Sequence, residues 1–103
     1  MRYLILESKL DKFINEFLND IYDNLHDDTY SDFIILREPF DDEVEELGEI
    51  IMEFDYSDGR LYVLHSIINK MYSLFGLDRE DAYKKVGEWF SDKFGVEISL
   101  IES

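Results

Sequence analysis

The 103-residue chain contains no cysteine, one proline, five glycines and only ten basic residues against 25 acidic ones. Without cysteine it forms no disulfide and no thiolate metal site and has no cysteine nucleophile, which fits a reducing cytosol. No stretch is rich in proline or glycine, so the sequence predicts no linker and a single domain over residues 1–103. The scarcity of bases argues against direct nucleic-acid binding, because phosphates require a basic patch.

Long apolar runs are missing as well. The opening MRYLIL is too short for the core of a signal peptide, and no run approaches the ~20 residues of a membrane-spanning helix. We therefore expect a soluble, cytoplasmic protein that does not contact a membrane. Hydrophobic residues nevertheless make up 46% of the chain, and aromatic residues 16%, which is enough for a core in a domain of this size.

The net charge of −15 is confined to one part of the chain. Between Phe13 and Gly59 there are sixteen acids and one base, Arg37, whereas nine acids and nine bases cancel in the remainder. If this segment forms one contiguous face, it produces a one-sided negative field that attracts basic surfaces.

Hydrophobic periodicity predicts an α+β fold with helices packed on one face of a small antiparallel sheet. In the first helix, apolar residues recur at three- and four-residue spacing from Leu10 to Leu25, with Phe13 in the buried stripe. The last strand alternates and is expected to turn Leu100 inward. The expected helices are 9–25, 66–75 and 79–94, and the expected strands are 33–38, 49–56, 60–65 and 96–101.

Capping residues support the boundaries of the two later helices. Ser66 is a candidate N-cap of the second helix and Gly76 follows its end, while Asp78 starts the third helix and Gly95 ends it. The aromatic stripe of the third helix, which includes Trp89, is expected to be core rather than a binding surface. The stretch FDDEVEELGE is ambiguous between a short helical turn and an acidic loop.

The stretch EFDYSDGRLYVLH, residues 53–65, brings several oxygen ligands together and raises the question of a metal loop. A calcium loop of the EF-hand type needs oxygens at positions one, three and five, then glycine and a later bidentate glutamate. With Asp55 at position one and Ser57 at position three, Asp58 and Gly59 each come one position earlier than the loop requires, and the bidentate glutamate is missing. A hairpin explains the stretch better, because Asp-Gly favours a two-residue type I′ turn. In that register residue 56 faces 61, with a bulged variant one residue out of register left open.

The predicted hairpin has two unlike faces. One face carries the apolar side chains together with His65, which we expect to be packed and hydrogen-bonded. The other face carries Glu53, Asp55 and Arg60, with Ile51 among them.

No catalytic motif and no cofactor-binding residue stand out, so an enzyme is the weaker class. Serine-nucleophile and phosphate-binding glycine motifs are absent from the sequence. One alternative is a metal-binding or metal-dependent hydrolytic domain that uses His26 with Asp27, Asp28 and acids from elsewhere. It requires these groups to converge around an open coordination position.

The favoured hypothesis is a non-enzymatic interaction protein whose acidic half binds a basic surface, such as that of a nucleic-acid-binding host protein, in the manner of a DNA mimic. Two alternatives remain open, a solubility role for the acids and a self-associating structural component. The residues expected to contact the partner are Asp20, Asp23, Asp27, Asp28, Asp41, Asp42, Glu43, Glu45 and Glu46.

Three stretches, MRYLILESKLDKFINEFLN, FDYSDGRLYVL and GEWFSDKFGVEISLI, together resemble small, uncharacterised acidic proteins encoded by tailed bacteriophages, many of them marine. The resemblance is one of general sequence style, extends over most of the chain and includes no catalytic motif. It implies expression in the cytoplasm of an infected bacterium, and it carries no site residue over to this chain.

Overall fold

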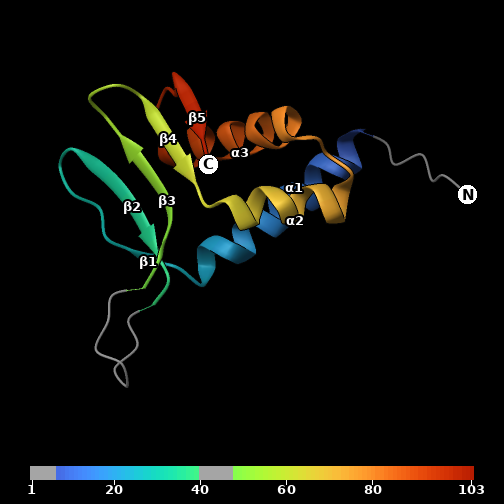
Figure 1. Ribbon diagram of the computed structural model, residues 1–103, viewed down its shortest axis with the longest axis horizontal. Coiled ribbons are helices and arrows are strands. Elements are labelled where there is room, and N and C mark those ends of the chain that lie inside the picture. Colours follow the sequence, from blue (N-terminus) through green and yellow to red (C-terminus); the bar gives the residue numbers. More distant parts are fainter. Residues whose placement is uncertain (1–6, 40–47) are drawn as a thin grey trace, which may run out of the picture.

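The computed structural model of the protein describes residues 7–39 and 48–103 and has the predicted α+β architecture (Figure 1). A five-stranded sheet packs against three helices. The helices are α1 (Glu7–Asp23), α2 (His65–Phe75) and α3 (Arg79–Phe94), and the strands are β1 (His26–Asp27), β2 (Phe33–Arg37), β3 (Ile50–Asp55), β4 (Arg60–Val63) and β5 (Leu100–Glu102).

The sheet is mixed rather than antiparallel throughout, which corrects the prediction. The strands lie in the order β1-β2-β3-β4-β5, and the first three pairings are antiparallel. The last pairing, between β4 and β5, is parallel. The reason is the connection, because α2 and α3 form a crossover that returns the chain to its starting side. The two-residue edge strand β1 was not predicted.

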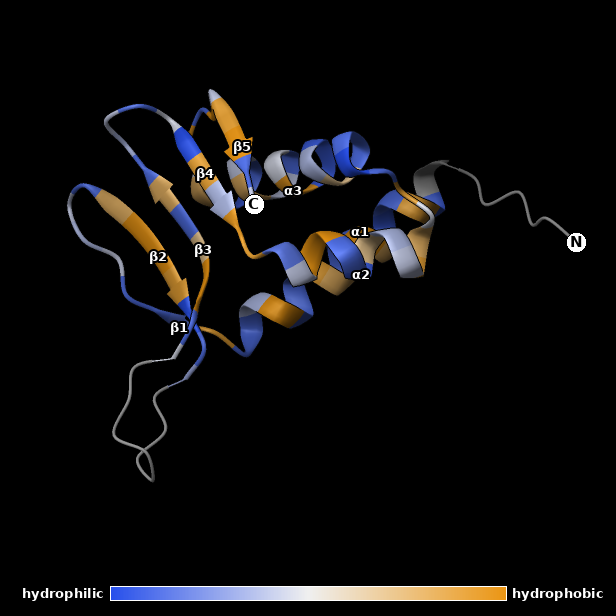
Figure 2. Ribbon diagram, in the orientation of Figure 1, coloured by the Kyte–Doolittle hydropathy of each residue, from blue (hydrophilic) through white to orange (hydrophobic). Residues whose placement is uncertain are grey.

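The core lies between the helices and one face of the sheet, and all three helices cover that face (Figure 1). Within the described residues no polar or charged side chain is buried. Figure 2 shows the hydrophobic stretch of β2 beside the mixed composition of β3 and β4. The rings of Phe54 and Phe90 join the two layers, with their centroids 5.8 Å apart. The inward side chains of the strands are Ile34, Leu36, Met52, Phe54, Leu61 and Val63.

Helices α1 and α3 are joined by polar contacts around a buried aromatic side chain. The indole Nε1 of Trp89 donates a hydrogen bond to Asn19 Oδ1 at 2.9 Å. Lys85 Nζ donates to Asp11 Oδ1 at 2.6 Å, and Lys93 Nζ lies 4.3 Å from the centroid of the Tyr22 ring. Since Trp89 is 6% exposed, the prediction that the stripe on α3 is core is confirmed.

The β3–β4 hairpin has the predicted faces but not the predicted register. Phe54 pairs with Leu61 and Asp55 with Arg60, so the turn has four residues, 56–59, in place of two. The change displaces the pairing by two residues, and an even displacement leaves the side chains of the paired residues, 52–55 and 60–63, on their original faces. The turn is longer because Asp55 O accepts from Gly59 N at 2.9 Å, with Gly59 at φ +70°.

Four local expectations about the strands and helix α2 were wrong. Helix α2 begins at His65 with Leu64 as its N-cap and no side-chain cap, so Ser66 does not cap it, and His65 is exposed instead of packed. Ile51 is buried, because a bulge opposite Leu36 and Arg37 interrupts the alternation there. Leu100 is 53% exposed, since the last strand starts only at that residue and Ile101 faces inward instead.

The apolar stripe of α1 is wider than the surface it buries. Ile14 and Leu18 are fully buried, whereas three other residues of the stripe, Leu10, Phe17 and Ile21, are half-buried. Phe13, predicted to be core, is 49% exposed.

We expect alanine at Gly59 to destabilise the protein more than alanine at Gly76. Both glycines have positive φ, where a side chain costs about 1–2 kcal/mol. A Cβ at Gly76 meets nothing within 4 Å, whereas one at Gly59 lies 2.7 Å from Ser99 Oγ and 3.2 Å from Ser99 N. Urea denaturation of Gly59→Ala and Gly76→Ala measures the difference. Equal losses would contradict the close packing of the turn against the segment before β5.

Candidate functional site

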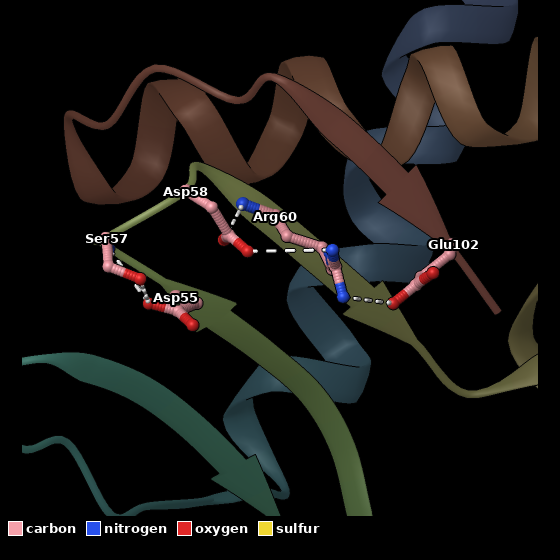
Figure 3. Close-up of polar contacts among 5 residues, drawn as sticks. All are labelled: Asp55, Ser57, Asp58, Arg60 and Glu102. Carbon is pink, nitrogen blue, oxygen red and sulfur yellow. Dashed lines mark hydrogen bonds and ion pairs between the residues drawn. The ribbon is translucent and has the colours of Figure 1, made fainter.

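The hairpin turn uses its carboxylates to fix its own backbone (Figure 3). Asp55 Oδ1 accepts hydrogen bonds from Ser57 N at 2.8 Å and from Ser57 Oγ at 2.7 Å. Asp58 Oδ1 accepts from Arg60 N at 3.1 Å. These are turn interactions rather than ligand positions around a cation.

The hydrogen bonds also hold Asp55 in its ionised form. The Ser57 hydroxyl has the largest effect in lowering the pKa of Asp55 below its ordinary value, the Ser57 backbone N–H adds to it, and the charge of Arg60 contributes less. Asp55 therefore remains negative on the outer side of the hairpin at neutral pH.

The face of the sheet opposite the helices carries both charged and apolar side chains, and no described helix packs against it. We call this surface the open sheet face. Strand register places its side chains in two rows, one with Glu53 beside Tyr62 and one with Asp55 beside Arg60. A shallow depression of about 170 Å³ lies among them. The open sheet face comprises Phe33, Ile35, Glu53, Asp55, Arg60, Tyr62, Leu100 and Glu102.

The two arginines of the strand region are both engaged by acids of the same region. Arg37 Nε lies 3.2 Å from Asp28 Oδ2, and that pair is largely shielded from solvent. Arg60 reaches Asp58 and Glu102 in opposite directions, each at 3.7 Å (Figure 3). These last pairs are exposed and contribute little to stability.

The predicted partner-binding acids fall into two described groups. Asp20 and Asp23 are exposed near the end of α1, and Asp27 is exposed on β1, where it accepts a hydrogen bond from Thr29 Oγ1. Asp28 is half-buried against Arg37. The other five predicted acids, Asp41, Asp42, Glu43, Glu45 and Glu46, lie outside the described residues.

Acids of the strand region that the prediction left out lie beside these groups. Glu38 and Glu49 are exposed on adjoining segments, with Glu38 N donating to Glu49 O at 2.9 Å. Glu53 and Asp55 lie on the open sheet face, where strand alternation had already placed them. The count of acids along the chain included these four residues, but they were left out of the predicted partner contacts, because the count does not show which face of the sheet the helices leave uncovered.

The metal hypothesis receives no support from the part of the chain that the structure describes. There, no three histidine or carboxylate side chains are grouped so that they could hold a metal ion. His26 is exposed on β1, and its neighbour Asp28 is turned to Arg37.

Comparison of the chain with protein-family models, with curated proteins and with solved structures gives no match. Among the described helices, none is both long enough and apolar enough to cross a membrane.

We expect Ser57→Ala to raise the pKa of Asp55 toward the ordinary value of about 3.9, because it removes the strongest interaction with the carboxylate. Since the folded-state pKa is lowered, the associated stabilisation is present above the ordinary value and is lost as the pH falls through the folded-state pKa. A carboxyl NMR titration measures the midpoint. Ser73→Ala, on exposed α2 surface, is the control, and an unmoved midpoint in Ser57→Ala would refute the assignment.

The acids at the end of α1 face the negative end of the helix dipole, and no base lies in its last turn. We expect Asp23→Asn to raise the free energy of unfolding by about 0.3–1 kcal/mol at low ionic strength. Glu80→Gln removes the same charge from the first turn of α3 and should lower stability instead. Thermal denaturation distinguishes the two, because simple relief of net charge would stabilise both variants.

Proposed function

We propose that the protein is a non-enzymatic interaction protein whose strand region binds a basic surface of a partner protein. The observation that carries the proposal is a local surplus of carboxylates. The described residues between 26 and 63 contain eight acids and two bases, and both bases are paired within the same region. Residues 65–94, which hold α2 and α3, contain five acids and five bases.

The surplus carboxylates are turned outward rather than neutralised. Asp27, Asp32 and Glu53 take part in none of the ion pairs among the described residues, and the first two are exposed. Asp32 lies on the connection before β2 and Glu53 on the open sheet face, whereas Asp27 is exposed on the edge strand β1, where it pairs with Leu36. This arrangement favours a cationic partner and disfavours a nucleic acid, since phosphates would be repelled.

The class of partner follows from the same chemistry. A surface that presents carboxylates in place of phosphates competes with nucleic acid for a basic groove. The resemblance to small acidic phage proteins makes nucleic-acid-binding proteins of a bacterial host the class to test first. A solubility role is the competing explanation, and it requires only net charge and no particular placement.

We expect placement to matter more than net charge in a capture experiment from bacterial lysate with salt-gradient elution. The triple variant Asp27→Asn, Asp32→Asn, Glu53→Gln should lose a basic partner that the wild type retains. The matched control Glu88→Gln, Asp92→Asn, Glu97→Gln removes three exposed acids from α3 and the segment after it. It should keep the partner, because charge on that side does not face it.

A DNA duplex added to the wild-type complex should release the partner if the acids occupy a nucleic-acid-binding groove. Equal loss in both triple variants would indicate that only net charge matters and would overturn the proposal. Retention unchanged in both would overturn it as well.

A further inference from the structure

The helical layer contains an apolar groove between α1 and α2 with a volume of about 680 Å³. On one side lie the half-buried residues of α1, and on the other lie α2 and the strand residues that precede it. We call it the α1–α2 groove. Its apolar lining comprises Phe17, Ile21, Leu25, Pro39, Ile51, Leu64 and Ile67.

The groove continues into an exposed apolar stripe along both helices. Phe17 packs edge-on against Phe75 with centroids 5.7 Å apart, whereas Leu25 shares the groove with Leu64, so the two helices run antiparallel beside it (Figure 1). Phe13 lies one turn before Phe17 on the same side of α1 and is 49% exposed. Leu74 is two turns beyond Ile67 on the same side of α2 and is 62% exposed.

Charges at the rim define what fits the groove. Asp20 and Glu38 line it against a single base, Lys70, and the exposed Glu16 and Asp23 lie next along α1. A second copy of the chain would bring another net charge of −15 to the same rim and would be repelled. An apolar anion such as a fatty acid meets the same repulsion. The complementary occupant is apolar on one side and positive at its edges.

We propose that the α1–α2 groove binds an amphipathic, lysine- or arginine-bearing helix of the partner protein. An amphipathic helix places apolar side chains at i, i+3, i+4 and i+7. The apolar residues of α1 and α2 that border the groove have the same spacing. The helical part of the stripe, from Phe13 to Ile21 on α1, spans about 12 Å, which matches about two turns of such a ligand. The inference rests on the proposed function, because it identifies the element with which the basic partner is recognised.

Titration with a designed peptide tests the groove directly. The probe is a leucine–lysine peptide of about 18 residues patterned as an amphipathic helix, and the control is the same composition in scrambled order. We expect backbone amide NMR shifts at Ile21, Ile67 and Lys70 with the patterned peptide and none there with the scrambled one.

A pair of double variants isolates the apolar contribution. Phe13→Ser/Leu74→Ser should weaken peptide binding by about tenfold or more, because both side chains lie on the stripe. Tyr56→Ser/Tyr72→Ser removes two equally exposed rings, 51% and 65% exposed, from the turn and from the opposite side of α2. Its affinity should stay within about twofold of the wild type. All four side chains are exposed, so both variants are expected to fold.

Each contrary outcome identifies a different failure. Shifts confined to the strand region, around Glu53 and Tyr62, would overturn the groove proposal and leave the acidic interaction function standing. Equal binding of the scrambled peptide would reduce the interaction to net charge. Concentration-dependent shifts at the groove in the protein alone would assign it to a second copy and overturn the proposal.

Discussion

The packing of all three helices on a single face of the sheet is the constraint on which the rest of the structure depends. All three helices pack on that face, so the strands alternate between side chains in the core and side chains that no described helix covers. The core itself holds no polar group among the described residues, which leaves the carboxylates to the other face, the turns and the helix surfaces. The placement of charge thus follows from the layer architecture.

The negative charge is kept at a cost to the folded state. Acids at the end of α1 oppose its dipole, and like charges across the strand region repel one another. The two arginines offset only part of this, because the Arg60 pairs are long and exposed.

Periodicity in the sequence was sufficient to predict the fold class, the three helices and the faces of the hairpin, because period-two and period-3.6 patterns depend only on which residues avoid water. The register of the hairpin was predicted wrongly, since the bonds from Ser57 and Gly59 to Asp55 outweighed the preference of Asp-Gly for a two-residue turn. The direction of β5 depends on how α2 and α3 connect it to β4, and no local sequence pattern encodes that connection.

The candidate surfaces were predictable to a similar degree. Charge along the chain predicted Asp20, Asp23 and Asp27 as partner contacts. The structure shows that all three are exposed, and their role in binding stays a prediction. The pairing of Arg60 with Glu102 was not predictable, since it joins residues far apart in sequence through the β4–β5 contact. Nor was the groove, because the exposure of Phe13 depends on how α2 crosses α1. The only sequence signal for the groove was the apolar stripe of α1, which is wider than the packing of one helix requires.

The two surfaces would act on different stages of binding. Interactions of exposed carboxylates reach across roughly 10 Å at moderate salt, so they accelerate encounter with a basic partner and are weakened by ions. Contacts in the α1–α2 groove act only after docking and depend little on salt, so they set how long the complex lasts. A partner held by charge alone would exchange with any basic protein in the cell. The addition of an apolar groove with acids at its rim would select a helix with the matching order of apolar and basic residues, which charge placement alone would not do.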